Sequence, residues 1–339
     1  MTRATNTSVV DSRYYEAVDG GYRCLLCPNF CIIRKGSRGL CGTRRACPEG
    51  LRAVNYGQVS ALNIDPMEKK PLYHYHPGED VLSVGGLGCN LSCDHCQNHN
   101  ISQTMVGEGD STFISPEKLR ELCRAKGIRN LAFTYNESGI WLEYILDVLE
   151  GQDDLHGIMV SNGYLNPEPV RDLCHVVRAM NIDVKGFSEE FYRNVCHGSL
   201  APVLETAAIA HSEDLHLELT YLVIPGRNDS PEDIRKFCDW VGSSLSVSVP
   251  VHFTRFHPDY LMMDAPSTPL ETLAAARDSA YDSGLKYVYI GNAPVHLDSH
   301  TYCPSCGEKV VERRGFEARF LNMEDGRCQV CRKQLDFIL

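Results

Sequence analysis

Between about residues 80 and 292, the chain repeats one pattern of hydrophobic and polar positions. A short run of β-branched or aromatic residues is followed by a polar loop and then by an amphipathic stretch with helical spacing. Strands that alternate with helices predict βαβ units and a parallel sheet, which is either doubly wound or rolled into a barrel. The seven runs that predict strands are residues 81–86, 131–135, 157–162, 181–186, 215–224, 251–256 and 287–292.

The stretches between these runs carry typical helix starts. Ser115 precedes Pro116 at the first helical position, and Gly127 ends the same stretch. Ser230 and Thr268 likewise stand directly before a proline. We therefore expect helices to begin at these three positions.

Polar residues stand at the C-terminal end of almost every predicted strand. For any one of them, a loop cap or a solvated strand end is the simpler explanation. In a parallel barrel, however, these ends share one rim, where the chemistry gathers, so the joint pattern favours a barrel with a site at that rim. The residues are Asn136, Glu137, Ser161, Asn162, Asp183, Lys185, Arg255, His257 and Asn292.

Length and composition are those of a globular protein. The 339 residues, 43% of them hydrophobic, suffice for one large domain with small appendages. The polar first 21 residues hold no apolar run of signal-peptide length, and no stretch approaches a membrane span of about 20 apolar residues, so we expect a cytoplasmic protein. A formal net charge of -11 argues against nucleic-acid binding and is compatible with a basic electron donor or a small substrate.

Cysteine is unusually frequent, with 16 residues, and eleven of them fall into three spaced clusters. This arrangement is expected of metal ligands in a reducing compartment rather than of disulfides. Cys47 is a possible spare ligand. The other four scattered cysteines are interpreted as core or surface thiols: Cys123, Cys174, Cys196 and Cys238.

The central cluster, Cys89, Cys93 and Cys96, follows the first predicted strand. Each iron of a [4Fe–4S] cluster needs an outer ligand, so three cysteines leave one iron open to a ligand from outside the protein. The alternatives are three buried thiols or half of a zinc knuckle, but free cysteines have no reason to keep a fixed spacing.

The other two clusters each offer four thiols. Two Cys-x2-Cys pairs with 21 residues between them predict a structural zinc ribbon near the C-terminus, formed by Cys303, Cys306, Cys328 and Cys331. Near the N-terminus, zinc and a second iron–sulfur cluster are both open, because both use four thiolates. The residues there are Cys24, Cys27, Cys31 and Cys41.

Cys-x3-Cys-x2-Cys after the first strand of a βα repeat resembles the signature of the radical S-adenosylmethionine (SAM) superfamily. Within it, the chain looks like the pyruvate formate-lyase activating-enzyme-like branch, and more closely like the radical enzyme of the AmmeMemoRadiSam system. The matching stretches span about residues 22 to 331 and are RCLLCPNFCIIRKGSRGLCG, DPMEKKPLYHYHPG, GCNLSCDHCQNHNIS, FTYNES, VSNGY, IDVKGF, LVIPGRNDS, YIGNAP and TYCPSCG.

The resemblance implies that the central cysteines ligate a [4Fe–4S] cluster and that neighbouring residues bind SAM. Glu137 would lie near the SAM amine, Asn162 near its ribose or carboxylate, and Lys185 near its carboxylate. His95 fills the place of an aromatic residue that covers cofactor and cluster. His257 resembles the histidine on the sixth strand of activating enzymes.

One position departs from the family pattern. Activating enzymes place an acidic residue two positions before Asn162, where it holds a monovalent cation together with the residue equivalent to Asp183. Here that position is Val160. Asp183 therefore lacks one partner for such a cation.

Residues upstream of the barrel could pack on its outside as a linker or face the substrate. They are Lys69, Lys70, His74 and His76. Metal binding by His74 and His76 has weaker support, because a His-x-His pair is by itself weak evidence for a metal site.

The resemblance implies a partial (β/α)6 TIM-like barrel over residues 80–298. We expect a Cys-rich metal-binding segment over 1–50, a barrel-packing linker over 51–79 and a zinc ribbon over 299–339. The implied partners are an electron donor such as flavodoxin or ferredoxin, and Memo-type and AMMECR-type proteins.

The implied activity is reductive cleavage of SAM to a 5′-deoxyadenosyl radical, which abstracts hydrogen from a substrate. Alkylation or carbon–carbon bond formation on an apolar molecule falls within this expectation. Two alternatives remain open: an enzyme that activates a glycyl-radical enzyme, and a zinc-dependent binding module without catalysis.

Overall fold

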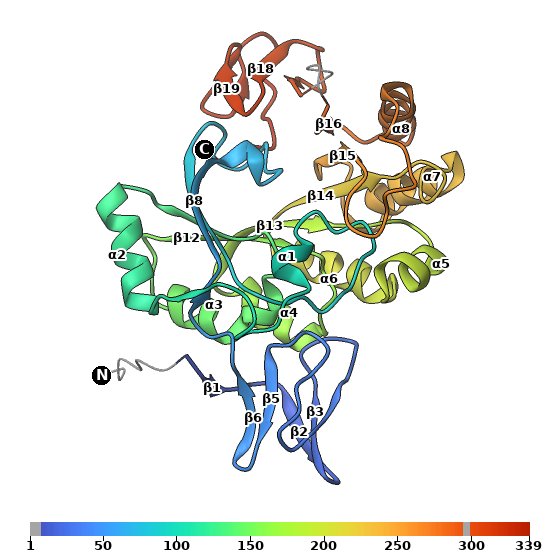
Figure 1. The fold of residues 1–339 in the computed structure, drawn as a ribbon. Coiled ribbons are helices and arrows are strands. Elements are labelled where there is room, and N and C mark those ends of the chain that lie inside the picture. The colour runs from blue at the N-terminus through green and yellow to red at the C-terminus, as the bar shows by residue number, and fades with distance from the viewer. Residues whose placement is uncertain (1–7, 294–298) are drawn as a thin grey trace.

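The structure, a computed structural model, describes residues 8–293 and 299–339. Its main sheet has eight strands, seven of them parallel and arranged in chain order (Figure 1). All seven predicted strands are confirmed. The parallel strands are β9 (Asp80–Gly85), β11 (Asn130–Phe133), β12 (His156–Ser161), β13 (Val177–Asp183), β14 (His216–Val223), β15 (Val251–Arg255) and β16 (Val288–Gly291).

The order of the strands decides between the two predicted architectures. A doubly wound sheet reverses its strand order at a switch point, whereas this order runs without reversal from β9 to β16. The sheet does not close, because β16 forms one edge and β8 (Ala61–Pro66), antiparallel to β9, forms the other. Six parallel strands, from β9 to β15, are each followed by a main helix, in agreement with six predicted βα units, and the last hydrophobic run pairs with β15 as a seventh parallel strand.

The helices follow one another around the outside of the sheet (Figure 1). Two predicted starts are confirmed, because Ser115 Oγ accepts a hydrogen bond from Lys118 N, and Ser230 Oγ accepts one from Asp233 N. The larger helices are α2 (Pro116–Lys126), α3 (Leu142–Leu149), α4 (Pro167–Cys174), α6 (Ala201–Ser212), α7 (Pro231–Trp240) and α8 (Leu270–Asp282), and the short ones are α1 (His99–Ser102) and α5 (Glu189–Phe191).

The predicted start at Thr268 is wrong, because α8 begins at Leu270 and Thr268 makes no capping bond. Its buried hydroxyl instead donates to Val223 O and accepts from Phe256 N. Thr268 therefore ties together the ends of two neighbouring strands.

Residues 67–76 lie against the inner face of the sheet. Met67, Leu72 and Tyr75 form a buried cluster with alternate residues of four strands, namely Val81, Ala132, Ile158 and Ala179. The other face of the same strands packs on the helices. Of the two alternatives considered from the sequence, packing on the outside is therefore wrong, because the segment fills the concave side of the sheet.

A buried carboxylate fixes this segment. Glu218 on β14 accepts hydrogen bonds from Tyr73 N at 3.0 Å and from His74 N at 2.7 Å. The Nε2 atoms of His216 and His252 lie 3.0 Å and 2.6 Å from the same carboxylate. Burial opposes the charge of Glu218, but the bonds from the histidines outweigh it and hold its pKa well below the usual value.

The N-terminal lobe consists of two small antiparallel sheets below the main sheet in Figure 1. It docks on the core through Asn166, whose N donates to Leu26 O and whose Nδ2 donates to Leu25 O. The strands are β1 (Val10–Asp11), β2 (Tyr15–Val18), β3 (Gly21–Cys24), β4 (Ile32–Arg34), β5 (Arg44–Cys47) and β6 (Gly50–Ala53). Farther along the chain, β7 (Gln58–Val59) pairs with β10 (Thr112–Phe113).

The C-terminal segment folds as a small β unit on the opposite side of the molecule (Figure 1). Arg313 anchors it, donating to Tyr73 O at 2.6 Å with its guanidinium over the Tyr73 ring. Residues 294–298, the end of the predicted barrel domain, and residues 1–7 lie outside the described part of the chain. The strands are β17 (Thr301–Tyr302), β18 (Lys309–Arg314), β19 (Glu317–Phe320), β20 (Met323–Glu324) and β21 (Arg327–Cys328).

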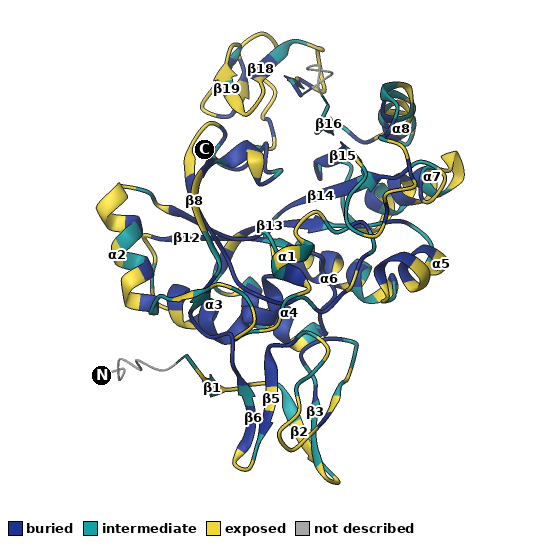
Figure 2. Cartoon of the chain, viewed as in Figure 1, coloured by how far each residue is buried: buried dark blue, intermediate teal, exposed yellow. Residues whose placement is uncertain are grey.

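Burial follows this arrangement, with the main strands buried and the outer helix faces exposed (Figure 2). In the described ranges, no helix combines the length and the apolar character needed to cross a membrane.

Candidate functional site

A cavity of about 390 Å³ lies at the C-terminal ends of the parallel strands. All three central cysteines line it, together with most of the polar residues that the sequence places at strand ends. Among the described residues that line it, Arg255 and His257 are absent. The strand-end residues brought together are Asn136, Glu137, Ser161, Asn162, Asp183, Lys185 and Asn292.

The loop that carries the cysteines is fixed by hydrogen bonds from several parts of the core. Asn136 donates to Gly88 O at 2.7 Å and accepts from Gly86 N at 3.1 Å. Asn90, inside the cysteine motif, donates to Tyr164 O at 2.6 Å. These contacts hold the loop in one geometry, as a ligand set needs.

Cys93 is buried, whereas Cys89 and Cys96 are partly exposed. Burial raises the pKa of Cys89, and contact with the Cys196 thiol together with burial raises that of Cys93. Ser92 N also donates to Cys196 O. Cys196, which the sequence marks only as a scattered thiol, therefore lies beside a central cysteine.

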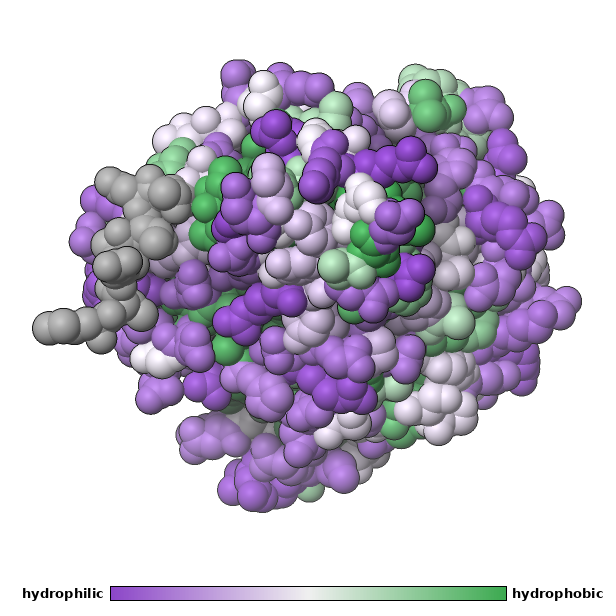
Figure 3. Space-filling view, turned by 90° about the horizontal axis from the view of Figure 1, so that it is seen from below, coloured by the Kyte–Doolittle hydropathy of each residue, from purple (hydrophilic) through white to green (hydrophobic). Residues whose placement is uncertain are grey.

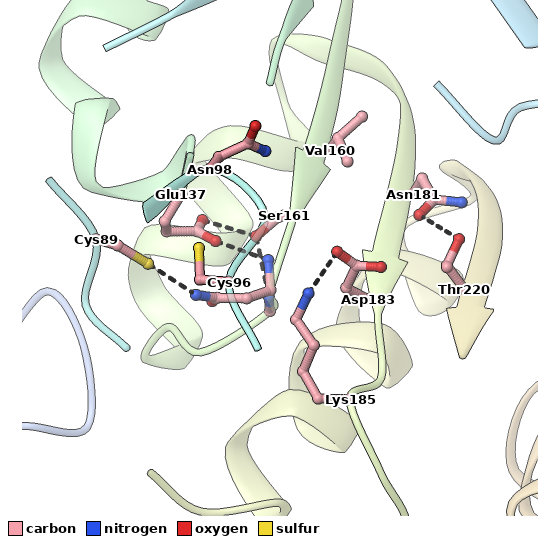
Figure 4. Close-up of polar contacts among 12 residues, drawn as sticks. Cys89, Cys96, Asn98, Glu137, Val160, Ser161, Asn181, Asp183, Lys185 and Thr220 are labelled. Carbon is pink, nitrogen blue, oxygen red and sulfur yellow. Dashed lines mark hydrogen bonds and ion pairs between the residues drawn. The ribbon is translucent and has the colours of Figure 1, made fainter. Parts of the chain in front are cut away.

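Glu137 is buried and receives three hydrogen bonds, of which Figure 4 shows the one from Ser161. Its carboxylate accepts from Gly139 N at 2.7 Å, Ser161 Oγ at 2.8 Å and Asn162 N at 2.7 Å. Burial raises its pKa, whereas these donors act in the opposite direction. The carboxylate thus links the end of β11 to the end of β12.

Asp183 and Lys185 form an ion pair at the end of β13, with 2.6 Å between Oδ2 and Nζ (Figure 4). Burial disfavours the charge of Lys185, but Asp183 and Cys93 raise its pKa above the usual value. Val160 also lines the cavity, where activating enzymes have an acidic residue. Lys185 therefore neutralises Asp183 where the family pattern places a monovalent cation.

The two candidate histidines occupy different places. His95 is 3% exposed and lines the cavity, and in the described part of the chain both of its ring nitrogens lack a hydrogen-bond partner. Burial lowers its pKa to about 3, so the ring is neutral. His257 is exposed outside the cavity lining, with Nδ1 3.3 Å from Gln97 Nε2.

Lys70, Asp65 and Tyr135 form a further group near the cavity, and the sequence pointed to Lys70 alone. Lys70 Nζ lies 2.6 Å from Asp65 Oδ2, and Tyr135 Oη donates to the same oxygen at 2.8 Å. Tyr135 has a φ of 74°, a conformation uncommon for residues other than glycine. Proximity of Lys70 to the site was one predicted alternative, whereas Asp65 and Tyr135 carry no sequence signal beyond their place in matching stretches.

The structure separates His74 and His76 from this cavity. His74 is fully buried, with Nδ1 2.7 Å from Asp336 O and a neighbour in Tyr289. Neither histidine belongs to a potential metal-binding group in the described ranges.

The C-terminal cysteines come together as the ribbon prediction requires. Their sulfurs all lie within 4.8 Å of one another. The distances are 3.5 Å between Cys303 and Cys331 and 3.7 Å between Cys306 and Cys328. This group could bind a metal ion.

Comparison with known proteins bears on the family and the fold of this chain. The family described as the Radical SAM superfamily matches residues 84–240. An uncharacterized protein of Methanocaldococcus jannaschii is 41% identical over 97% of this chain and 99% of its own length.

Two solved structures are also similar. A radical SAM methyltransferase from Sphaerobacter thermophilus has a TM-score of 0.50 at 11% identity, covering 69% of this chain and 71% of that one. A domain of pyruvate-formate lyase-activating enzyme from Bacteroides vulgatus has a TM-score of 0.42 at 18% identity, covering 48% of this chain and 98% of that one. At such identities the similarity concerns the fold.

Proposed function

The chain belongs to the radical SAM superfamily and is an enzyme with radical SAM chemistry, and we propose that the cavity at the strand ends binds a [4Fe–4S] cluster and SAM side by side. Cys89, Cys93 and Cys96 would hold three irons and leave the fourth to SAM. The observation that carries the proposal is that these cysteines line one cavity with Glu137 and Lys185.

The residues present fit these two groups. Lys185 offers a cation to the SAM carboxylate, with Asp183 fixing its position. The buried carboxylate of Glu137 suits the SAM amine, which is a hydrogen-bond donor. The neutral ring of His95, with both nitrogens unpartnered among the described residues, is available to contact SAM or the cluster.

When bound, the cluster supplies one electron that splits SAM into methionine and a 5′-deoxyadenosyl radical, and this radical takes a hydrogen atom from the substrate. The chain's own part is to hold both groups and to limit the access of water. Residues 67–76 contribute by filling the concave side of the sheet beneath the cavity.

The lining also bears on the substrate class. Beyond the cysteines and the proposed SAM contacts, the cavity presents mainly polar side chains, namely Lys69, Lys70, Asn181, Thr220, Thr254 and Asn292. Asn181 Oδ1 accepts from Thr220 Oγ1 at 3.0 Å (Figure 4). We infer a polar substrate that can exchange hydrogen bonds with these groups, in preference to the apolar molecule considered from the sequence.

The pathway stays a prediction from the resemblance. The proposed partners are Memo-type and AMMECR-type proteins and a flavodoxin or ferredoxin as electron donor. The alternative function is activation of a glycyl-radical enzyme.

For the C-terminal cysteines we propose zinc, because sulfurs in a tetrahedron about 2.3 Å from one ion are roughly 3.8 Å apart. The separations of 3.5 Å between Cys303 and Cys331 and 3.7 Å between Cys306 and Cys328 are close to that value.

The test is anaerobic reconstitution with iron and sulfide, followed by dithionite, SAM and detection of 5′-deoxyadenosine. We expect the product from the wild-type chain and its loss in Cys93→Ala. Cys238→Ala, which alters a buried thiol on α7, is the matched control. A fully loaded wild-type protein that forms no 5′-deoxyadenosine would overturn the proposal.

A further inference from the structure

The structure points to a second iron–sulfur centre in the N-terminal lobe: we propose that Cys24, Cys27, Cys31 and Cys41 together hold a [4Fe–4S] cluster. This site is separate from the SAM cavity. It resolves the choice between zinc and iron that the sequence leaves open.

The four cysteines come from separate places in the lobe and line one small cavity. Cys24 ends β3, Cys31 directly precedes β4, and Cys24 N donates to Cys31 O at 2.9 Å. Leu26, Ile33 and Ile140 form the apolar part of the lining. Cys47, the possible spare ligand, is not among the described residues that line it.

The spacing of the sulfurs differs from that in the C-terminal ribbon. In the described part of the chain, only the ribbon cysteines form a group whose sulfurs all lie within 4.8 Å. A cluster of four irons and four sulfides holds its ligand sulfurs farther apart than a single ion does. The central cysteines, which lie within the region that matches the radical SAM family, likewise do not form such a close group among the described residues.

The space between the N-terminal sulfurs supports the same conclusion. The four cysteines line a cavity of about 10 Å³. Four sulfurs that bind one zinc ion close around it at about 2.3 Å. An open space beside the sulfurs therefore suits a larger inorganic core better than a single ion.

Arg44 gives independent evidence for an anionic occupant. It is 2% exposed and lines the cavity, and its Nη2 pairs with Glu143 Oε2 at 2.9 Å. Its Nη1 is buried and has no hydrogen-bond partner in the described ranges. Glu143 already neutralises one positive charge, so the unused N–H group indicates a second acceptor inside the cavity.

A cluster bound by four thiolates supplies that acceptor. Its sulfides and thiolates carry net negative charge and accept hydrogen bonds, which are known to tune such clusters. Neutral thiols would leave Nη1 buried without a strong acceptor. A bound cluster would therefore give the buried Nη1 of Arg44 a hydrogen-bond acceptor, whereas four neutral thiols would not.

The lobe places this centre directly behind the SAM loop. A Cβ on Gly88 would stand 2.3 Å from Cys41 O, so only glycine allows this approach. Asn29, which lines the N-terminal cavity, donates from Nδ2 to Asn90 O at 2.7 Å. The backbone of Cys41 thus packs against Gly88, the residue before Cys89, so the N-terminal and the central cysteines are neighbours in the fold.

Seen from the side of this lobe, the surface is mostly hydrophilic with small separate hydrophobic areas (Figure 3). Phe30, Ile32 and Leu40 are nevertheless exposed next to Cys31 and Cys41. The cluster would therefore lie near the surface of the lobe. With four cysteine ligands it has no open iron, so SAM should not alter its spectrum.

The test uses the full-length chain, reconstituted anaerobically, in three forms. We expect about eight irons per wild-type chain, and about four in a Cys89→Ala/Cys93→Ala/Cys96→Ala variant. The reduced variant should give an electron paramagnetic resonance signal that SAM leaves unchanged. A Cys27→Ser/Cys41→Ser variant should keep about four irons and a signal that responds to SAM.

The metal content of the same variants can also contradict the second cluster. A triple variant without iron, from a chain that carries about two zinc ions, would overturn the second cluster. It would leave the SAM site intact, because that site is read separately in the Cys27→Ser/Cys41→Ser variant. Failure of that variant to respond to SAM would count against the proposed function alone.

Arg44 offers a second readout in the triple-variant background. Arg44→Met removes a positive charge beside the cluster, so the midpoint potential should become more negative. Arg45→Met, on the exposed side of the same strand, is the matched control and should leave the potential unchanged. An unchanged potential in a folded Arg44→Met protein would contradict the contact between Arg44 and the cluster.

Discussion

The side-chain Nδ2 of Asn162 lies 3.6 Å from the Sγ of Cys89. The backbone N of Asn162 donates to the Glu137 carboxylate at 2.7 Å. The side-chain Nδ2 also donates to Asn90 Oδ1 at 2.9 Å. One residue at the end of β12 therefore contacts a proposed cluster ligand, the loop that carries it and a proposed SAM-binding carboxylate. Changes at Asn162 should affect both cofactors.

Asn162→Ala should reduce 5′-deoxyadenosine formation by about 10- to 100-fold, because residues that orient metal ligands typically contribute that much. The measurement is the initial rate at fixed cluster content. Asn194→Ala, at an exposed position, is the control and should not change the rate. A wild-type rate in Asn162→Ala would show that this contact has no role in the chemistry.

Lys185→Met should weaken SAM binding by about 10- to 100-fold, since a hydrogen bond between charged groups contributes about 1.5–3 kcal/mol. Equilibrium titration of the reconstituted protein with SAM measures this effect. Lys236→Met, on the exposed face of α7, is the control. Unchanged affinity in Lys185→Met would assign the SAM carboxylate to another partner.

Cys196→Ser should retain the SAM-responsive cluster, although Cys196 lies beside Cys93. The proposal requires three cysteine ligands and one open iron, so a fourth thiol must not be needed. Iron content and the effect of SAM on the reduced spectrum measure this. Loss of the cluster in Cys196→Ser, to the same degree as in Cys93→Ser, would contradict the three-ligand site.

Removal of metal from the ribbon should lower thermal stability. Its buried cluster contains only a few apolar side chains besides its cysteines, so metal binding must supply much of its folding energy. Cys306→Ser/Cys331→Ser should lose one zinc per chain and show an earlier unfolding transition. Full zinc content in this variant would place the ion elsewhere.

Stability should also fall in mild acid because of His74. Burial lowers its pKa to about 3 from the ordinary value of 6.5. Below pH 6.5 the unfolded chain binds a proton that the folded chain does not accept until about pH 3, so stability falls by up to about 1.4 kcal/mol per pH unit across this window.

The check is the free energy of unfolding between pH 7 and pH 5, compared with that of His74→Gln. The variant should show a weaker pH dependence, although its stability at pH 7 should be lower because buried hydrogen bonds are lost. His175→Gln, at an exposed position, should keep the wild-type slope. An unchanged slope in His74→Gln would assign the acid sensitivity to other groups.

Local features of the sequence were sufficient to predict the elements. Strand positions follow from short runs of β-branched or aromatic residues, and the helix starts at Ser115 and Ser230 follow from capping bonds that span three residues. Thr268 has the same local signal, but its hydroxyl is taken by Val223 and Phe256 from neighbouring strands. Tertiary contacts therefore overrode capping at that one position.

Sequence alone also determined the cysteine spacing of the central motif and the parallel direction of the strands, because ligand spacing and hydrophobic periodicity act over short distances along the chain. The order of the strands in the sheet came from the tertiary structure. Only the tertiary structure decided that residues 67–76 lie inside the sheet, that His257 stays outside the cavity lining, and that Arg44 lies beside four cysteines. These arrangements join residues far apart in sequence, and no local pattern encodes which buried charge meets which partner. They follow from packing, in which most buried polar groups find an acceptor or a donor.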